Sequence, residues 1–382
     1  MSYREMPRAR TNACERSFLE VAVAKLNALT TAAGFGDGER AGAVRLLGDL
    51  FVGWGDEPIR AAPRMQSDIG DDHFPIEFSL AFGGASGTPE VRVLFETRAP
   101  GASIHERWVA GLDLCARLER AHGASLDGLR CVADLFAPTD PSARYAMWHA
   151  VCLRPNCEPK FKLYVNPEAR GAGRAPEVVV DALRRLGIAH PAPEAVRFRR
   201  AGDRYKFFSL DLASTLDARV KAYKVHRGAT RGDIDAELAA AASYVPGLLE
   251  LFWRTIAGDD GPFDGLPIST YLSWRADDDR RPGAGTAHFP IRAYVCNDLV
   301  ARDRVRRMLV APDLAVYDRA IGAFADRPLA SGVGMHAYVS LSFDHGPPRV
   351  TVYLAPEGYD VAPPRPYVVP RPRIGTTNAK ST

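Results

Sequence analysis

Short segments with alternating polar and apolar residues recur along the whole chain. The segment RVKAYKV, residues 219–225, places Arg219, Lys221 and Tyr223 on one face of a strand and Val220 and Ala222 on the other. This period of two predicts a β-strand, and one such strand alone would ordinarily turn its polar face to water. When the same pattern recurs in one register along many strands, it favours polar faces that point into a shared interior.

Five pairs of such segments predict ten antiparallel strands. The pairs are IEFSLAF with VRVLFET, WHAVCL with KFKLYVNP, KFFSLDLA with RVKAYKV, ISTYLSW with TAHFPIRAYV, and AYVSLSF with RVTVYLA. The second strand of each pair carries a cation or a histidine, and these residues are Arg92, Lys162, Arg219, His288 and Arg349, between 57 and 70 residues apart. The spacing indicates a fivefold internal repeat.

Helical periodicity fills the segments between the strand pairs. Residues 105–123, HERWVAGLDLCARLERAHG, repeat apolar residues at helical spacing and end on Gly123, a typical helix cap. We expect further helical stretches within residues 175–188, 231–258 and 302–325. The sequence therefore predicts an α+β protein built from five ααββ-type repeats.

Ten antiparallel strands predict a closed barrel, because closure removes the exposed edges of a sheet. With helices outside, the apolar strand faces point outward and the polar faces point into the lumen. The outward set is Ile76, Phe78, Leu80, Val91, Val93, Phe161, Leu163, Val220, Phe289, Ile291, Val350 and Val352. The inward set is Glu77, Ser79, Arg92, Lys162, Tyr164, Arg219, Lys221, Tyr223, Thr286, His288, Arg292, His336, Tyr338, Arg349, Thr351 and Tyr353.

Composition indicates an ordinary globular protein. The chain has 382 residues, of which 46% are hydrophobic and 25% charged, and its net charge of +3 is too small to argue for nucleic acid or a membrane as partner. No apolar run approaches the roughly 18 residues of a membrane helix, and the start lacks a secretory signal, so we expect a cytoplasmic protein. The six cysteines include no CxxC pair, which predicts reduced core thiols without a disulfide framework or structural zinc.

One domain accounts for nearly the whole chain. We expect a flexible N-terminus at residues 1–14 and a single barrel domain at residues 15–360. Residues 361–382 are rich in proline and polar residues, which predicts an extended or disordered tail without a catalytic role.

The cations of the predicted lumen require a counter-charge, because an unpaired ion taken out of water is strongly destabilising. Few acids face them: Glu77, with Glu96 and Asp211 as further candidates. A diphosphate that arrives as ligand fits the number of arginines and lysines. The interleaved tyrosines suit a ligand that becomes a carbocation when diphosphate leaves, since aromatic faces stabilise cations and a closed wall excludes water.

Six motifs, in order along the chain, carry a family resemblance. They are DDHFPIEFSLAF, VRVLFE, KFKLYVNP, ARVKAYKVH, HFPIRAYV, and HAYVSLSF with RVTVYLAPEGY. Over about residues 40 to 360 the chain resembles bacterial aromatic (indole) prenyltransferases of the dimethylallyltryptophan synthase type. The resemblance implies the ABBA prenyltransferase barrel, with ten antiparallel strands inside a ring of helices. It also implies transfer of a dimethylallyl group from dimethylallyl diphosphate to the indole of L-tryptophan or a tryptophan-derived small molecule.

The resemblance implies roles for individual residues. Glu77 matches the acid that accepts the indole N–H, although it could instead simply pair with a lumen cation. Lys162 matches a lysine often proposed to remove the ring proton. The implied diphosphate-binding set is Arg92, Lys162, Arg219, Lys221 and Arg349, and the implied carbocation shield is Tyr164, Tyr223, His288, Tyr338 and Tyr353.

Two positions depart from the family pattern, and a third lies near a substrate-binding position. His288 stands where the shield usually has tyrosine, and Thr286 stands where glutamine is common. If His288 were protonated, it would bind diphosphate instead of stabilising a cation. Lys206 lies near the position where some relatives hold the amino-acid carboxylate, so the expected acceptor-binding residues are Glu77, Lys206 and Thr286.

We expect no metal and no cofactor, so Mg²⁺ should not be required. Many enzymes that use prenyl diphosphates hold Mg²⁺ through a DDxxD motif, but neither Asp71–Asp72 nor Asp277–Asp279 has the second acid at that spacing. Both runs are interpreted as turns. The segment GFGDGERAG follows a helical stretch and is interpreted as a helix stop, not as a nucleotide-binding loop.

The sequence thus predicts a metal-independent Friedel–Crafts electrophilic substitution that releases diphosphate. Its partners would be small molecules, and the protein would be a monomer or a homodimer. Two alternatives stay open: prenylation of a phenol such as tyrosine, and a barrel that binds an anion without catalysis. Glu77→Gln separates enzyme from binder, because a binder would keep its diphosphate affinity and has no turnover to lose.

Overall fold

The computed structural model describes residues 16–84, 87–98, 103–214, 218–276, 278 and 280–366. The predicted flexible N-terminus, Asp277, Asp279 and residues 367–382 of the predicted tail lie outside these residues. The beginning of that tail contacts the barrel domain: Ala362 forms a bridge with Val333, and the backbone N–H of Arg365 donates to the carbonyl of Cys296 at 2.8 Å.

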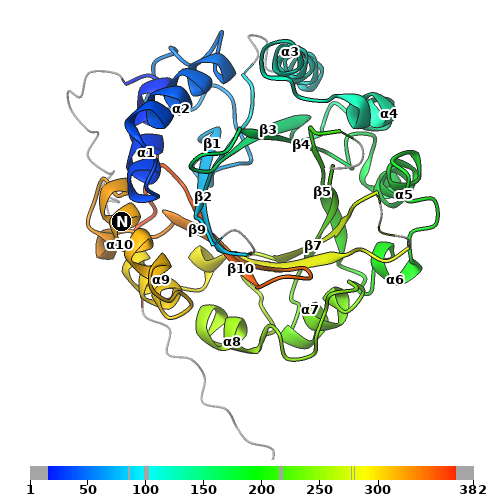
Figure 1. Ribbon diagram of the computed structural model, residues 1–382. Helices are drawn as coiled ribbons and strands as arrows, with labels where there is room; N and C mark the ends of the chain where they lie inside the picture. The colour runs from blue at the N-terminus through cyan, green and yellow to red at the C-terminus, as the bar shows by residue number, and fades with distance from the viewer. Residues whose placement is uncertain are drawn as a thin grey trace, which may run out of the picture.

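Ten antiparallel strands close into a barrel, as predicted (Figure 1). The strands are β1 (Ile76–Gly83), β2 (Glu90–Phe95), β3 (Met147–Leu153), β4 (Lys160–Val165), β5 (Arg204–Asp211), β6 (Val220–His226), β7 (Ile268–Trp274), β8 (Ala284–Phe289), β9 (His336–Phe343) and β10 (Arg349–Leu354). Consecutive strands pair along the chain, and β1 pairs with β10. Every strand of this barrel therefore has a neighbour on both sides, so that within the described ranges the barrel has no open edge.

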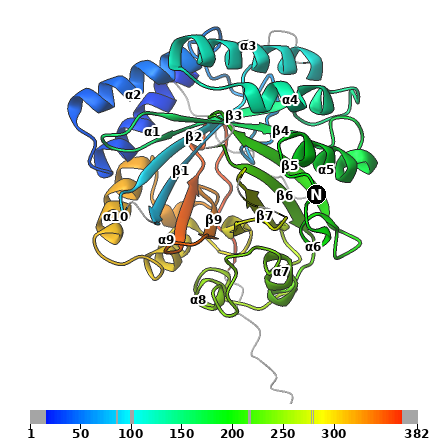
Figure 2. The same cartoon turned by 45° about the vertical axis from the view of Figure 1, so that its right-hand side comes forward.

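Helices surround the barrel in both views (Figures 1 and 2). They are α1 (Phe18–Ala32), α2 (Asp37–Leu50), α3 (Ile104–His122), α4 (Asp127–Phe136), α5 (Ala175–Arg185), α6 (Pro193–Val196), α7 (Arg231–Leu238), α8 (Glu250–Phe252), α9 (Asp298–Arg306) and α10 (Asp313–Phe324). Short 3₁₀ turns lie at Ala172–Arg174, Ile291–Ala293 and Leu329–Ser331, and a π-helical turn lies at Trp253–Ala257. Helices precede each of the five strand pairs, which confirms the predicted repeat.

Two of the predicted helical stretches are interrupted. Residues 231–258 form α7 and then, after a break, the short α8 and its π-helical turn. Residues 302–325 are divided between α9 and α10. Pro246 and Pro312 lie in or next to the two breaks, where a proline lacks the N–H that a continuous helix needs and clashes with the preceding turn.

The main hydrophobic core lies between the barrel and the helices. All the residues predicted to point outward are buried in this one cluster. The ring of Phe78 on β1 meets Phe324 of α10 at a centroid distance of 5.7 Å, and Phe208 on β5 stacks on Phe136 of α4 at 5.2 Å. Because the apolar strand faces are covered from outside, the opposite faces enclose a polar lumen.

A β-bulge on β9 reverses one predicted side-chain direction. Tyr353 pairs with Tyr338 whereas Leu354 pairs with His336, so Ala337 is an extra residue in β9. His336 therefore lies on the outer side of the barrel, where its Nε2 is 2.8 Å from the hydroxyl of Tyr317 in α10. The prediction that His336 lines the lumen is wrong, because a bulge breaks the period of two.

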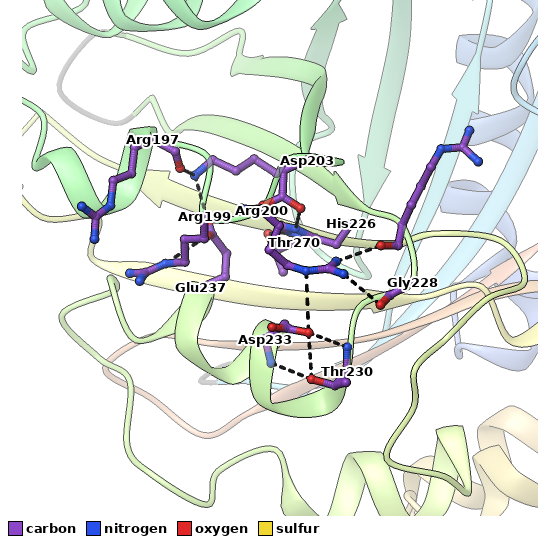
Figure 3. Close-up of polar contacts among 12 residues, drawn as sticks. Arg197, Arg199, Arg200, Asp203, His226, Gly228, Thr230, Asp233, Glu237 and Thr270 are labelled. Carbon is purple, nitrogen blue, oxygen red and sulfur yellow. Dashed lines mark hydrogen bonds and ion pairs between the residues drawn. The ribbon is translucent and has the colours of Figure 1, made fainter.

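A buried polar network joins the outer side of β5, β6 and β7 to α7 (Figure 3). The Lys224 ammonium lies 2.7 Å from Glu237 of α7. His226 lies between Asp203 and Thr270, with each ring nitrogen 2.9 Å from an oxygen. Lys224 is in register with Tyr205, whose hydroxyl donates to the backbone carbonyl of Val196 in α6, so this face points away from the lumen. We infer that this network stabilises the fold and takes no part in the chemistry of the lumen.

We expect Glu237→Gln to destabilise the fold by about 3–5 kcal/mol, because the charge of Lys224 would stay buried without its counter-ion. Lys224 is only 2% exposed, and burial already lowers its pKa. Glu250→Gln is the matched control, since Glu250 pairs with Arg231 at a site where the two side chains are 45% and 31% exposed, and about 0–1 kcal/mol is expected. Equal losses in chemical denaturation of the two variants would contradict this account.

Candidate active site in the barrel lumen

A first group of basic residues in the lumen surrounds Glu90. Arg92, two residues further along β2, lies 2.5 Å from Glu90, and Arg154 contacts the other carboxylate oxygen at 2.5 Å. Arg349 of β10 lies 3.7 Å from the same acid. Burial alone would raise the pKa of Glu90, but Arg92 and the neighbouring cations hold it well below its usual range. Glu90 is therefore an ionised acid of the lumen that the sequence analysis missed, although alternation places it on the same face as Arg92.

A second group of basic residues surrounds Asp211 at the end of β5. Its carboxylate lies 2.9 Å from Arg219 and 3.6 Å from Lys162, which is its register partner on β4. Lys221 lies near this group, and burial together with Lys162 and Arg219 lowers its pKa well below the usual value. The five predicted diphosphate-binding residues are thus brought together, with Arg154 added. Their excess over Glu90 and Asp211 suits a multiply charged anion.

Aromatic rings line the lumen beside the basic groups. The Tyr223 ring contacts Tyr164 at a centroid distance of 5.9 Å, Phe207 at 5.7 Å and Tyr271 at 4.4 Å. Tyr164 and Tyr223 were predicted here, whereas Tyr271 was not, although Ser269, Tyr271 and Ser273 share one face of β7. Phe207 was also missed. A bulge makes Lys206 an extra residue of β5, which shifts the alternation on which the prediction depended.

A cavity continues the lumen alongside these rings. Its lining residues are Asp68, Ile69, Glu77, Leu94, Trp148, Tyr164, Lys206, Phe207, Tyr223, Ser269, His288, Tyr338 and Tyr353. Glu77 lies near the start of β1, whereas Arg349 is in register with Gly83 at the other end of the same strand. The lumen therefore has a basic end and a cavity end, which we call the cradle and the acceptor cavity.

Glu77 is the buried acid of the acceptor cavity. It is 7% exposed, and among the described residues no cation lies within ion-pairing distance of it. Burial raises the pKa of Glu77 to about 8, although Arg292 and Lys206 oppose the shift. The geometry therefore does not support the alternative that Glu77 simply pairs with a lumen cation. A carboxyl group in this state would gain a hydrogen-bond partner from a ligand that brings an N–H.

His288, Tyr338 and Tyr353 form one aromatic wall of the acceptor cavity. The imidazole of His288 stacks on Tyr338 at 4.2 Å and meets Tyr353 edge-on at 4.6 Å. Burial, assisted by Lys206 and Arg292, lowers the pKa of His288 to about 3, so its ring is neutral. A protonated His288 that binds diphosphate, as the sequence left open, is not supported.

Arg292 connects this wall to the loop that contains Asp71. It lies on a 3₁₀ turn, not on the predicted longer strand, because Pro290 ends β8 at Phe289. One guanidinium nitrogen donates to the Tyr338 hydroxyl at 3.1 Å and to Asp71 at 2.7 Å. Burial would raise the pKa of Tyr338, but Arg292 and Lys206 outweigh burial and lower it.

The remaining predicted site residues divide between the two regions. Lys206 lines the acceptor cavity, with its ammonium 4.9 Å from the centroid of the Phe207 ring. Thr286 faces the lumen but donates its hydroxyl to Ser342 at 2.9 Å and does not line the acceptor cavity. Trp148 lines the cavity and was not predicted, although it is in register with Tyr164 on the neighbouring strand.

Neither a metal-binding cluster nor a membrane-spanning helix occurs within the described ranges. No cluster of three or more His, Cys, Asp and Glu residues there could hold a metal ion. Asp72 accepts the backbone N–H groups of Phe74 and Tyr359, both at 3.0 Å, so the run at Asp71–Asp72 is a turn as predicted. In the part of the chain that the structure describes, no helix combines the length and apolar character needed to cross a membrane.

The prediction that the cysteines are core thiols is wrong for two of them. Cys115 and Cys152 are buried free thiols, as predicted, whereas Cys131 and Cys157 are exposed. Cys131 lies on the outer side of α4, and Cys157 lies in the turn between β3 and β4. Cys14 lies outside the described residues.

Comparison with known proteins adds independent information. The family model of tryptophan dimethylallyltransferases matches residues 40–235. A solved 6-dimethylallyl tryptophan synthase is 36% identical, with 93% of this chain and 100% of that chain covered and a TM-score of 0.85. The 6-dimethylallyltryptophan synthase from Micromonospora olivasterospora, solved with DMASPP and Trp, is 35% identical over 91% of this chain and 100% of that one, with a TM-score of 0.84. The 5-dimethylallyl tryptophan synthase from Streptomyces coelicolor, also with DMASPP and Trp, is 33% identical over 94% and 100%, with a TM-score of 0.84.

Proposed function

The chain belongs to the tryptophan dimethylallyltransferase family, and from this premise we propose that it transfers a dimethylallyl group from dimethylallyl diphosphate to L-tryptophan or a tryptophan-derived small molecule. The observation that carries the proposal is the division of one closed lumen. Basic groups gather at one end, an acid in a cavity lies at the other, and aromatic rings line the space beside both. Each part has a separate task in the reaction.

The cradle takes the diphosphate of the donor. We assign Arg92, Lys162, Arg219, Lys221 and Arg349 to the phosphate oxygens, where negative charge develops as the C–O bond breaks. Preorganised cations stabilise that charge without reorganisation at the moment of reaction. Asp211 and Glu90 keep the basic side chains in place before the donor arrives.

The aromatic rings protect the allyl cation. Tyr164, Tyr223, Tyr338 and Tyr353, together with the neutral ring of His288, present aromatic surfaces to the space between the cradle and Glu77. Aromatic faces attract cations electrostatically, and a closed wall excludes the water that would quench the allyl cation. Tyr271 and Phe207 extend the wall.

Glu77 accepts the indole N–H of the acceptor. In the Friedel–Crafts step, the ring carbon attacks the allyl cation and positive charge spreads to the indole nitrogen. A carboxylate that accepts this N–H stabilises the charge as it develops. We assign Lys206 to the amino-acid carboxylate of the acceptor, because it lines the same cavity. Thr286, already bonded to Ser342, would act through the shape of the lumen.

We place the new bond on the benzene half of the indole. Two of the relatives are named for position 6 and one for position 5. We further propose that the reaction needs no divalent metal, since the cradle supplies the positive charge that Mg²⁺ provides elsewhere. A cytoplasmic location and a monomer or homodimer complete the proposal.

Prenylation of a phenol is less favoured by the site. A phenol acceptor would bring an O–H and no nitrogen that carries positive charge, so the buried Glu77 would have no N–H to accept. A barrel that only binds an anion would explain the cradle but not the acceptor cavity beside it.

Purified protein incubated with dimethylallyl diphosphate and L-tryptophan tests the proposal, with EDTA and without. We expect a product in which one ring hydrogen is replaced by a dimethylallyl group, at the same rate in both samples. Product with tyrosine and none with any indole would instead favour the phenol reaction. Diphosphate binding without product from any acceptor would favour the binding barrel.

The pH dependence of the reaction should report the ionisation of Glu77. Its carboxylate is the active form, and burial raises the pKa of Glu77 to about 8. We therefore expect kcat/KM for tryptophan to rise about tenfold per pH unit below that value and to level off above it, because kcat/KM reports the free enzyme. Glu77→Gln should remove the rise. A flat profile in the wild type would show that the ionisation of Glu77 does not control the reaction, and an unchanged rise in the glutamine variant would show that another group titrates.

A further inference from the structure

The last step of the proposed reaction requires a base in the acceptor cavity. After the ring carbon has attacked the allyl cation, its C–H bond must break and return its electron pair to the ring, and the proton must pass to a protein group. Lys162 is the candidate that the sequence suggests. Its ammonium lies 3.6 Å from Asp211 in the cradle, and Lys162 does not line the acceptor cavity. A group on the cavity wall is better placed.

His288 has the required position and an unused nitrogen. Its ring lies on the cavity wall between Tyr338 and Tyr353. The Nδ1 atom of His288 is buried, and within the described parts of the chain it has no hydrogen-bond partner. A buried polar atom left unpaired costs about 1–3 kcal/mol, so a nitrogen kept in this state calls for an explanation. Nδ1 itself is sealed from the cavity, so the imidazole would meet a ligand through its other nitrogen, Nε2, which takes part in no hydrogen bond found among the described residues.

The other polar residues of the cavity are less suitable. Asp68 is paired with Arg144 at 2.6 Å. Glu77 is assigned to the indole N–H, on the pyrrole half of the ring and away from the benzene carbons. Lys206, as an ammonium, has three donors and no lone pair to accept a proton. His288 is the described cavity-lining side chain that offers a neutral nitrogen base.

We propose that His288 removes the ring proton of the prenylated indole, an inference that rests on the proposed function. The C–H bond at the prenylated carbon breaks, its electron pair restores the aromatic ring, and the proton passes to an imidazole nitrogen to give an imidazolium. The imidazolium releases the proton to water when the product leaves. No oxidant or further reactant is needed.

The environment of His288 suits this role. Burial keeps the ring neutral before the reaction, so that it can accept a proton, and the lowered pKa favours loss of the proton afterwards. The intermediate is a strong acid, so a weak base in contact with its C–H bond is sufficient. Tyr338 stacks parallel to the imidazole within 21° and would stabilise the imidazolium.

The test compares His288→Phe with Lys162→Met, using ordinary and ring-deuterated L-tryptophan. Phenylalanine keeps a flat ring between Tyr338 and Tyr353 but has no nitrogen. We expect His288→Phe to lower kcat by about 10²–10⁴-fold, the usual contribution of a general base, and to show a primary isotope effect that wild type lacks. Lys162→Met should lower the rate with no isotope effect, because it acts on the donor.

A second variant keeps the test decisive if His288→Phe does not fold. His288→Gly should regain activity when imidazole is added, in proportion to its concentration, because the small base can enter the vacated space. An isotope effect in Lys162→Met but not in His288→Phe would overturn the proposal, as would an unchanged rate in His288→Phe or no rescue by imidazole. Absence of product from wild type with every indole would instead overturn the proposed function.

Discussion

Glu77→Gln is expected to lower kcat for tryptophan by about 10²–10³-fold, the usual cost of removing one group that stabilises transition-state charge. Glutamine has nearly the same size, but its neutral amide cannot compensate the positive charge that reaches the indole nitrogen. The affinity for dimethylallyl diphosphate should persist, because the cradle lies toward the other end of the lumen. Steady-state kinetics and calorimetric titration with the donor measure the two effects separately.

Asp68→Asn is the matched control for Glu77→Gln. Asp68 also lines the acceptor cavity, but its carboxylate is paired with Arg144 at the surface. The same loss of one negative charge there should change kcat by less than about tenfold, because the charge of Asp68 is compensated by Arg144, whose side chain is 72% exposed and screened by solvent. Similar losses of kcat in both variants would contradict this account. They would mean that the reaction depends on the total negative charge of the cavity and not on a specific contact of Glu77.

Arg92→Met is expected to lower kcat/KM for dimethylallyl diphosphate by about 10²–10³-fold, because it removes a buried cation from the leaving group. Its side chain is 17% exposed and contacts Glu90 within the cradle. Methionine preserves much of the length and the apolar stem. The KM for tryptophan should change little, since Arg92 does not line the acceptor cavity.

Arg154→Met serves as the control for Arg92→Met. Arg154 contacts the same acid, Glu90, but it lies after the end of β3 and is 28% exposed. Its removal should cost less than about tenfold in kcat/KM, as for a partly screened charge. A loss equal to that of Arg92→Met would place Arg154 in direct contact with diphosphate and would contradict the assignment of the phosphate oxygens to the other five basic residues.

Regular alternation made most of the barrel predictable. An uninterrupted period of two assigns each residue of a strand to a face, so Arg92 and Tyr223 could be placed in the lumen and Phe78 in the outer core. Closure followed from the number of strands. The same information would have revealed Glu90, which lies two residues from Arg92, and Tyr271, which shares one face of β7 with Ser269 and Ser273.

Local irregularities could not be derived in this way. One extra residue at Ala337 turns His336 outward, and one at Lys206 brings Phe207 into the lumen. A bulge leaves no reliable mark on a single sequence, because it depends on the fit between neighbouring strands. The network around Lys224 and Glu237 (Figure 3) was unforeseen for another reason: the two residues are 13 positions apart and meet only after α7 packs on β6.

The ionisation of the residues in the site could also be derived only from the three-dimensional structure. Glu77 and His288 were both identified from the sequence, but their ionisation depends on how deeply each is buried and on the distance to Lys206 and Arg292. That Nδ1 of His288 lacks a hydrogen-bond partner among the described residues is likewise evident only from the folded structure.

A crystal structure of the protein with L-tryptophan and a non-hydrolysable thiolodiphosphate analogue of the donor tests the central claim most directly. The account predicts diphosphate oxygens bound by Arg92, Lys221 and Arg349, and the indole N–H within hydrogen-bond distance of Glu77. It also predicts the allyl group between Tyr164 and Tyr353. Diphosphate bound outside the cradle, or an indole that turns its nitrogen away from Glu77, would contradict the account.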